Sequence, residues 1–161
     1  MKTLDEKLNL LRHNLPGQKV KIMIMGLGSV GAYLLDYLLS SGNDRMEVCV
    51  VGRREEKMVS DVNIARVAAL IRDQNRTETT IAGNIDFEDI DAIAGCFKAY
   101  KPDIVVNSSR AYPGLKYGSI SWNNVRAYGI WAPLAIKFTK NIMEAHEKAH
   151  SDAIVINTSY S

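Results

Sequence analysis

The residues whose spacing suggests chemistry are three glycines, Gly26, Gly28 and Gly31, in the run Gly-Leu-Gly-Ser-Val-Gly. Glycines spaced in this way can hold the diphosphate of a dinucleotide. The first allows a tight turn, the second lets the backbone approach the phosphates, and the third lets a helix pack closely. That helix would add free N–H groups and the positive end of its dipole. The candidate cofactor-binding residues of this turn are Gly26, Leu27, Gly28, Ser29, Val30 and Gly31.

Because glycines are common in turns, the same motif could also form a turn without a ligand, and the flanking segments bear on this choice. An apolar run at Val20–Met25 predicts a strand, and a helical periodicity begins at about Ser29. A second, β-branched run at Glu47–Val51 predicts a buried parallel strand. A strand, a helix and a second strand within about 30 residues are the context that dinucleotide binding requires. We therefore interpret the turn as a dinucleotide-binding site.

The residues after the second predicted strand bear on which dinucleotide binds. Sites for NAD usually carry Asp or Glu at this place, where the carboxylate accepts hydrogen bonds from the ribose hydroxyls. This chain has Gly52, Arg53 and Arg54 instead. Guanidinium groups bind a 2′-phosphate through bidentate, charge-assisted hydrogen bonds, so we expect NADP in preference to NAD. In the alternative, the arginines begin a solvated helix and pair with Glu55 or Glu56.

Three small polar residues, Asn107, Ser108 and Ser109, come at the end of a fourth predicted strand, Asp103–Asn107. In a doubly wound sheet this strand end lies beside the end of the first strand, and ligands bind in the crevice there. We expect these side chains to line the path of the ribose and nicotinamide. In the alternative, they only satisfy the backbone of the loop.

The alternation of strands and helices along the chain predicts the fold class. Further strands are predicted at Thr79–Ile85 and Ala153–Asn157, and no hairpin signals separate the strands. We predict an α/β fold with a doubly wound, Rossmann-like parallel sheet of at least five strands and helices on both faces. Residues 1–161 would form one domain, of which residues 1–17 are a short helical extension that packs against the domain or a partner subunit.

Two helices of this fold can be described further from the sequence. The helix at residues 55–74 has an apolar stripe that we expect to face the core. A longer helix is expected from about Trp122 to His150, with a break or kink near Pro133. The stripe consists of Ile64, Val67, Ala68 and Ile71.

The composition is ordinary for a globular domain of 161 residues, with 47% hydrophobic residues, 24% charged residues and a net charge of +2. No basic run suggests a nucleic-acid partner, and no apolar stretch is long enough to span a bilayer. The N-terminus lacks the apolar core of a signal peptide. Cys49 and Cys96 read as buried small hydrophobes, which suits a reducing compartment. We therefore expect a cytoplasmic protein without nucleic-acid or membrane partners.

Histidines offer neither a metal site nor a catalytic base. His146 and His150 lie four residues apart on a predicted helix, but no third ligand is in view. We expect both at the surface, at the opposite edge of the sheet from the crevice. His13 precedes the first strand. The catalytic acid and base stay unknown.

The order of these segments resembles the N-terminal cofactor domain of the lactate/malate dehydrogenase family, over roughly residues 21–161. Beyond the glycine turn, the fourth strand leads into a Pro-Gly loop, and Asn124 lies ten residues after Gly114, as an asparagine does in that family. The resemblance implies that Lys116, Tyr117 and Asn124 belong to the substrate loop, with Lys116 supplying positive charge. Tyr117 stands where the family has a substrate-polarising arginine.

The resemblance implies an NAD(P)-dependent oxidoreductase that transfers hydride to or from a small hydroxy-acid or carbonyl substrate. In that family a substrate domain follows the fifth strand, and we expect it to be missing here. Extended short-chain dehydrogenases, such as the nucleotide-sugar epimerases, and saccharopine-dehydrogenase-like proteins resemble parts of the sequence as well. The epimerases, however, have a longer Gly-x-x-Gly-x-x-Gly turn. A non-catalytic dinucleotide-sensing module is a further alternative. Each of these alternatives is compatible with a homo-oligomer.

Overall fold

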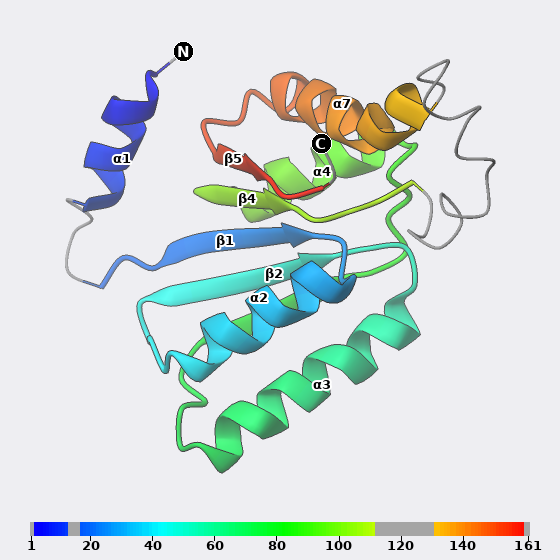
Figure 1. The fold of residues 1–161 in the computed structure, drawn as a ribbon. Coiled ribbons are helices and arrows are strands. Elements are labelled where there is room, and N and C mark those ends of the chain that lie inside the picture. Colours follow the sequence, from blue (N-terminus) through cyan, green and yellow to red (C-terminus); the bar gives the residue numbers. More distant parts are fainter. Residues whose placement is uncertain (1, 13–16, 112–130, 160–161) are drawn as a thin grey trace.

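Five parallel strands form one sheet in the computed structural model, which describes residues 2–12, 17–111 and 131–159 (Figure 1). The strand order is β3-β2-β1-β4-β5, and each neighbouring pair is parallel. The chain thus winds outward in both directions from β1, which confirms the predicted doubly wound sheet. The strands are β1 (Val20–Met25), β2 (Met46–Val51), β3 (Glu78–Ala82), β4 (Ile104–Asn107) and β5 (Ile154–Asn157).

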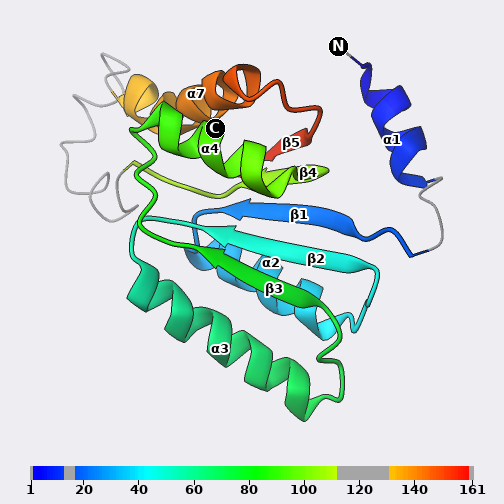
Figure 2. The ribbon, with the colours of Figure 1, turned by 180° about the vertical axis from the view of Figure 1, so that it is seen from behind.

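Helices cover both faces of this sheet, as predicted. α2 and α3 lie on one face, and α4 and α7 lie on the other (Figures 1 and 2). The N-terminal helix α1 stands beside the domain, where Lys2 Nζ lies 2.7 Å from Asp152 Oδ2 and Lys7 Nζ donates to the Ala153 carbonyl at 3.2 Å. The described helices are α1 (Leu4–Arg12), α2 (Ser29–Ser40), α3 (Glu55–Ile71), α4 (Ile90–Tyr100) and α7 (Trp131–Lys148).

The central strands are buried on both sides, because their side chains alternate between the two faces of the sheet and a layer of helices covers each face. In β1, Ile22 and Ile24 pack with residues of α2 and α3, whereas Met23 and Met25 pack with residues of α4 and α7. All four side chains are buried. This two-sided burial explains why the strand appears in the sequence as a continuous apolar run.

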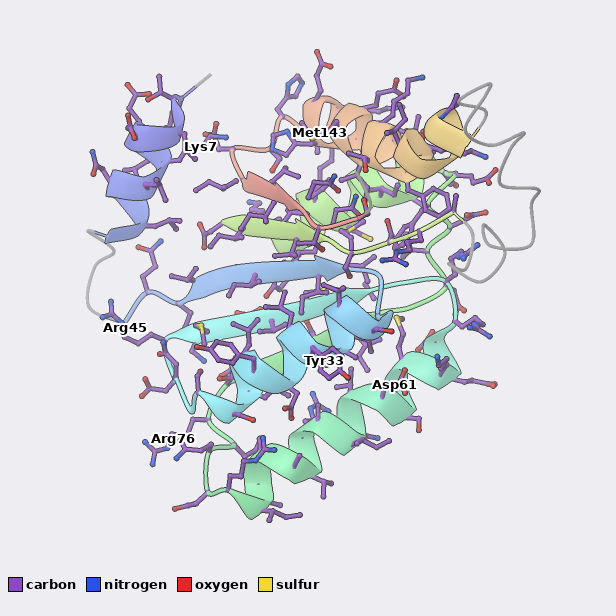
Figure 3. The ribbon with its side chains drawn as sticks, viewed as in Figure 1. Lys7, Tyr33, Arg45, Asp61, Arg76 and Met143 are labelled. Atoms are coloured by element: carbon purple, nitrogen blue, oxygen red, sulfur yellow. The ribbon has the colours of Figure 1, made fainter. Side chains whose placement is uncertain are left out.

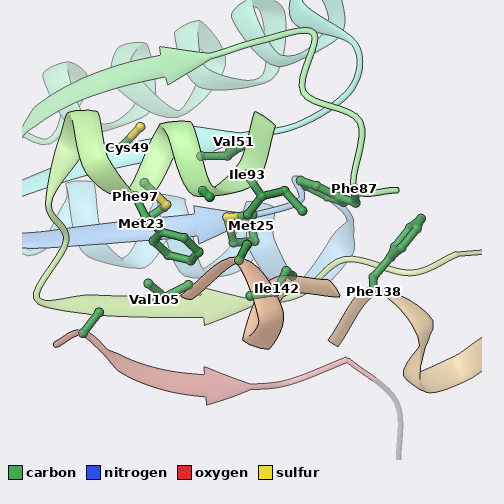
Figure 4. Packing of buried hydrophobic residues seen from close by; sticks show 13 residues of the cluster. Met23, Met25, Cys49, Val51, Phe87, Ile93, Phe97, Val105, Phe138 and Ile142 are labelled. Atoms are coloured by element: carbon green, nitrogen blue, oxygen red, sulfur yellow. The ribbon is translucent and has the colours of Figure 1, made fainter. Parts of the chain in front are cut away.

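Beneath α4 and α7 the core is rich in aromatic rings (Figure 4). Phe87 and Phe138 meet edge to face with their centroids 5.6 Å apart, close to the carboxyl end of the sheet. Cys49 is buried in the same cluster, and burial raises the pKa of its thiol. Cys96, also predicted to be buried, is only partly so.

The prediction for the core-facing side of α3 was wrong. The buried residues of this helix are Met58, Val62, Ala65 and Ala69. Two of them are alanines, which let the helix lie close to the sheet, and larger apolar side chains project outward. Of the predicted stripe, Ile64, Val67 and Ile71 are 66%, 55% and 80% exposed.

The prediction of a surface position for both histidines was wrong for His146. It is 4% exposed, packs edge to face on Phe97 and lies 3.1 Å through Nε2 from the Ala153 carbonyl oxygen. A buried ring satisfied by one backbone carbonyl leaves no pattern in the sequence that distinguishes it from a surface histidine. His150, just beyond the helix, is exposed as expected.

Several predicted boundaries differ from the observed ones by one to three residues, and β3 is one example. β3 ends at Ala82 instead of Ile85, because the chain turns at Gly83 and Asn84, the latter with a φ of +58°. Ile85 still donates its N–H to the Gly52 carbonyl at 3.0 Å. α7 is described from Trp131 to Lys148, and its predicted start at about Trp122 lies outside the described residues.

Candidate dinucleotide-binding site

A cavity of about 430 Å³ opens at the carboxyl ends of β1, β2 and β4. Here the strand order changes direction, which is where doubly wound sheets bind ligands. Among the predicted cofactor-binding residues, Gly31 and Asn107 do not line the cavity. Those that line the cavity are Gly26, Leu27, Gly28, Ser29, Val30, Gly52, Arg53, Arg54, Ser108 and Ser109.

Gly26 makes the turn out of β1, and both its conformation and its surroundings require glycine. Its φ of +90° is one that residues with a side chain rarely adopt. Its N–H donates to the Val51 carbonyl at 2.8 Å, so the turn starts as a continuation of the sheet. A Cβ on Gly26 would lie 2.9 Å from the Cα of Ser109. The turn therefore packs directly against the end of β4.

Gly31 is required by packing alone. A Cβ at this position would lie 2.3 Å from the Gly26 carbonyl oxygen and 2.7 Å from Ser108 Oγ. Ser108 itself donates through Oγ to the Gly26 carbonyl at 2.6 Å. The absence of a side chain on Gly31 thus lets α2 begin against both the turn and β4.

Gly28 differs from both of these glycines. Its backbone is extended, with φ of −84° and ψ of −168°, and a Cβ built on it would meet nothing within 4 Å. The chain's own packing therefore does not need glycine here. Because Gly28 lines the cavity, a side chain would instead occupy the space through which a ligand approaches the backbone. This open cradle fits the diphosphate of a dinucleotide.

The N-terminus of α2 keeps its backbone donors available for an anion. No side chain caps this helix, and its first turn contains no acidic residue. By contrast, the side chain of Asp89 caps α4 by accepting from the Ala92 N–H at 3.0 Å, and α3 begins with Glu55 and Glu56. Of these three helix starts, that of α2 suits a phosphate group best.

Arg53 and Arg54 lie on the cavity wall just beyond β2, and both are exposed. The guanidinium carbon of Arg53 lies 5.7 Å from the centroid of the Phe138 ring. Within the described residues neither arginine forms an ion pair. The Glu55 carboxylate accepts instead from Asn84 Nδ2 at 2.7 Å. Arg53 and Arg54 therefore do not pair with Glu55 or Glu56 in the structure, and that alternative is wrong.

Asn107 holds the end of β4 in place. Its Nδ2 lies 2.9 Å from Asn157 Oδ1 and 3.1 Å from both Thr139 Oγ1 and Ser159 Oγ. Its Oδ1 accepts from the N–H and the hydroxyl of Ser109 at 3.1 and 2.6 Å. Only 1% of Asn107 is exposed. This buried side chain joins β4, β5 and α7, and it orients Ser109 on the cavity wall.

Comparison with known proteins gives matches among solved structures only, since no protein-family model and no curated protein matches the sequence. A UDP-glucose-4-epimerase from Stenotrophomonas maltophila with bound NAD is 13% identical, with a TM-score of 0.60 over 86% of this chain. Lactate dehydrogenase from Eimeria maxima with NADH and oxamate is 15% identical, with a TM-score of 0.58 over 89%. A short-chain dehydrogenase from Oenococcus oeni psu-1 is 16% identical, with a TM-score of 0.61 over 91%.

The fold is a Rossmann fold. The strand order, the glycine turn at the end of β1 and these structural matches agree on this. The chain spans 36% of the epimerase, 37% of the lactate dehydrogenase and 64% of the short-chain dehydrogenase.

Some residues that line the cavity of this Rossmann fold were not singled out from the sequence. Lys57 and Asp61 lie one turn apart near the start of α3, with Nζ and Oδ2 3.9 Å apart. Thr158 follows β5 and donates through Oγ1 to the Asn107 carbonyl at 3.0 Å. The sequence signal that could have identified these residues is their position, either just after a predicted strand or in the first turns of the helix that follows a strand. The remaining cavity-lining residues that were not predicted are Met58, Phe87, Arg110 and Ala111.

Several residues considered from the sequence do not lie at this cavity. His146 and His150 are at the end of α7 that leads into β5, at the opposite edge of the sheet. No cluster of His, Cys, Asp and Glu that could hold a metal ion occurs in the described ranges. The helices described here include none that is both long and apolar enough to cross a membrane. The predicted substrate-loop residues Lys116, Tyr117 and Asn124, together with His13, lie outside the described residues.

Proposed function

We propose that this Rossmann domain binds a nicotinamide dinucleotide and serves as the cofactor domain of an oxidoreductase. The observation that carries the proposal is Gly28. It lines the cavity, its backbone conformation suits any residue, and no neighbour lies where its side chain would be. Glycine at this position is explained by a ligand and not by the fold. The matched epimerase structure contains NAD and the matched lactate dehydrogenase structure contains NADH, which supports the same class of ligand.

In this proposal the chain's own groups bind and orient the cofactor. The N–H groups at the start of α2 bind the diphosphate, and the missing side chain of Gly28 lets it approach the backbone. Ser108 and Ser109, held by Gly26 and Asn107, face the ribose and nicotinamide from the end of β4. When bound, the nicotinamide supplies the acceptor or donor of a hydride.

We further propose that NADP binds in preference to NAD. Arg53 and Arg54 lie on the cavity wall at the end of β2, where a ribose-binding acid would stand in an NAD site. Both guanidinium groups are exposed and neither is engaged by a carboxylate of the described chain. Lys57 adds a third cationic group to the same wall. A 2′-phosphate would therefore meet positive charge on this side of the cavity.

The proposed reaction is hydride transfer to or from a small hydroxy-acid or carbonyl substrate. Support comes from the resemblance of the segment order to the lactate/malate dehydrogenases and from the likeness to a lactate dehydrogenase structure that contains oxamate. In this proposal Lys116, Tyr117 and Asn124 contact the substrate.

A second candidate is an extended short-chain dehydrogenase of the nucleotide-sugar epimerase type. The TM-scores of the epimerase and the short-chain dehydrogenase, 0.60 and 0.61, support it as much as 0.58 supports the first candidate. The spacing of Gly26 and Gly28 favours the first candidate, because the epimerase turn is one residue longer. Ligand-observed NMR on the NADP-loaded protein separates the two. Binding of UDP-glucose would favour the second candidate, and binding of oxamate would favour the first.

The proposed function is tested by titrating NADPH and NADH into the protein and following the fluorescence of the reduced nicotinamide. We expect saturable binding, with NADPH bound more tightly. In the Gly28→Val variant the affinity for both should fall by at least about tenfold, because the side chain fills the approach to the backbone. Gly95→Val is the matched control, since a Cβ there also meets nothing within 4 Å but lies on α4, away from the cavity. Equal losses in both variants, or none in Gly28→Val, would contradict the proposal.

A further inference from the structure

Arg53 lies two residues beyond β2, and the alternation of the strand directs its side chain toward α7. Val51, the last residue of β2, packs in the core beneath α4 and α7. Gly52 lies on the α3 side, where a Cβ would be 2.6 Å from Met58 Sδ. Because side chains alternate along an extended chain, Arg53 is again on the side of Val51. Its guanidinium carbon lies over the Phe138 ring of α7, 5.7 Å from the ring centroid.

The Phe138 ring is held firmly beneath this guanidinium. It is 2% exposed and belongs to the buried stripe of α7, together with Ile142 and Ala145. The Phe87 ring meets it edge to face, and Asn141 Nδ2 donates to the Phe87 carbonyl at 2.8 Å. Figure 4 shows the two rings turned toward each other. The ring is therefore fixed by the core before any ligand binds.

The contact with this ring leaves the hydrogen-bond donors of Arg53 available. A cation over an aromatic ring is attracted by the electron-rich face of the ring, and this attraction uses the charge of the guanidinium and not its N–H groups. In the part of the chain that the structure describes, the Arg53 side chain forms no hydrogen bond and no ion pair. Its N–H donors can be directed at a phosphate while the ring restricts the positions of the guanidinium.

The other cations of the cavity wall lack such a support. Arg54 is exposed, and no aromatic ring of the described residues lies within cation–π distance of it. Lys57 belongs to α3 and lies 3.9 Å from Asp61, which Figure 3 shows on that helix. Ordering a long side chain on binding weakens the affinity by about two- to tenfold. We expect Arg54 to lose this factor, whereas Arg53 is ordered in advance.

We propose that Phe138 is a positioning residue for the selection of NADP, because it holds the Arg53 guanidinium at the cavity wall where a 2′-phosphate binds. This rests on the proposed function, in which Arg53 and Arg54 bind that phosphate. Phe138 is not among the residues that line the cavity, so it acts through Arg53 and does not touch the cofactor. A buried core residue on α7 thus contributes to the choice between NADP and NAD.

The first measurement needs no cofactor. NMR relaxation of the arginine Nε–H groups in the ligand-free protein reports how far each side chain is ordered on the picosecond to nanosecond timescale. Arg53→Ala and Arg54→Ala identify the two signals. We expect a higher order parameter for Arg53 than for Arg54, and a fall to the Arg54 value in Phe138→Leu. Equal order parameters in the wild type overturn the proposal, whatever the cofactor affinities are.

The second measurement is fluorescence titration with NADPH and NADH. Phe138→Leu should raise the Kd of NADPH by about three- to tenfold and change the Kd of NADH by less than about twofold. In an Arg53→Ala background the same substitution should change the Kd of NADPH by less than about twofold, because the ring acts only through Arg53. Phe97→Leu is the matched control and should leave the ratio of the two Kd values unchanged. Phe97 is also 2% exposed and lies in the same core cluster, but it packs on His146, away from the cavity.

Circular dichroism checks that each variant is folded, and Phe138→Met, which keeps an apolar side chain without a ring, replaces Phe138→Leu if that variant unfolds. The proposal is overturned, and the proposed function stands, if Arg53→Ala lowers the preference for NADPH but a folded Phe138 variant keeps it. It is also overturned if Phe97→Leu lowers the preference as much, since the effect is then one of core packing. A wild type that binds both cofactors equally, or neither, contradicts the NADP preference or the proposed function and overturns this proposal with it.

Discussion

Gly31 lies so close to Gly26 that a Cβ on Gly31 would be 2.3 Å from the Gly26 carbonyl oxygen. This contact fixes the start of α2 against the end of β1. Gly28, between the two, has no neighbour within 4 Å of its hypothetical Cβ. One motif therefore contains glycines with two separable roles: Gly26 and Gly31 shape the turn, and Gly28 leaves room for a ligand.

The first prediction concerns stability and follows from this contact. Gly31→Ala should lower the free energy of unfolding by about 1–3 kcal/mol, because the methyl group meets backbone atoms that cannot rotate away. Gly95→Ala adds the same methyl group to open space within α4 and should raise stability by about 0.5–1 kcal/mol through helix propensity. Urea denaturation of both variants measures the difference. Equal midpoints would mean that the turn is looser than the structure indicates.

The second prediction separates the two arginines of the cavity wall. Arg54→Ala should weaken NADPH binding by about tenfold, with little change for NADH and no change in stability, since Arg54 is exposed. Arg53→Ala should weaken NADPH binding similarly but also cost about 0.5–1 kcal/mol of stability, because its guanidinium lies over the Phe138 ring. Fluorescence titration and urea denaturation measure the two effects. If NADPH and NADH lose affinity equally, the arginines do not read the 2′-phosphate.

The third prediction concerns the hydrogen bonds around Asn107. Asn107→Ala removes the hydrogen bonds to Asn157 and Thr139 and leaves the N–H and the hydroxyl of the buried Ser109 without their acceptor, so it should cost about 2–4 kcal/mol of stability. Asn141→Ala is the matched comparison and should cost about 1 kcal/mol, because Asn141 makes one hydrogen bond, to the Phe87 carbonyl. Thermal or urea unfolding of the pair provides the measurement. A cost no greater for Asn107 than for Asn141 would contradict the role given to the network.

The parts of this fold that could be predicted from the sequence are those dictated by local rules. β1 was predicted with its observed ends, Val20 and Met25, because a strand buried on both faces is a continuous apolar run. The glycine turn follows it at once, and this order of elements predicted both the doubly wound sheet and the edge at which the cavity opens.

The predictions that failed depended on contacts between segments distant in sequence. The periodicity of α3 contains two apolar stripes, and only the sheet decides that Ala65 and Ala69 face inward. His146 is buried because Phe97 of α4 and the Ala153 carbonyl surround it. The hydrogen bonds of Asn107 to β5 and α7 likewise join segments that are distant in sequence, and no local pattern predicted them. Tertiary packing outweighs local pattern in each case.

The fourth prediction is a loss of stability at alkaline pH. Burial raises the pKa of the Cys49 thiol, with a hydrogen bond from Thr80 opposing it in part, and burial also raises the pKa of Cys96. The folded state therefore keeps these protons at a pH where the unfolded chain releases them. Their contribution to stability is complete below the ordinary thiol pKa of about 8.5 and is lost as pH rises toward the folded-state values. Burial raises the pKa of Tyr100 as well, which extends the loss to higher pH.

The free energy of unfolding, measured with urea from about pH 7 to pH 10, should therefore be flat at first and then fall. One thiol contributes a slope of at most about 1.4 kcal/mol per pH unit. Cys49→Ala should lower stability at every pH by about 1 kcal/mol, through the small cavity it leaves, but should flatten the alkaline fall. Cys96→Ala should flatten it less, because Cys96 is only partly buried. Since Tyr100 is intact in both variants, part of the fall in stability should persist in each. Parallel pH profiles in wild type and Cys49→Ala would contradict the prediction, because they would show that the Cys49 thiol ionises as readily in the folded state as in the unfolded chain.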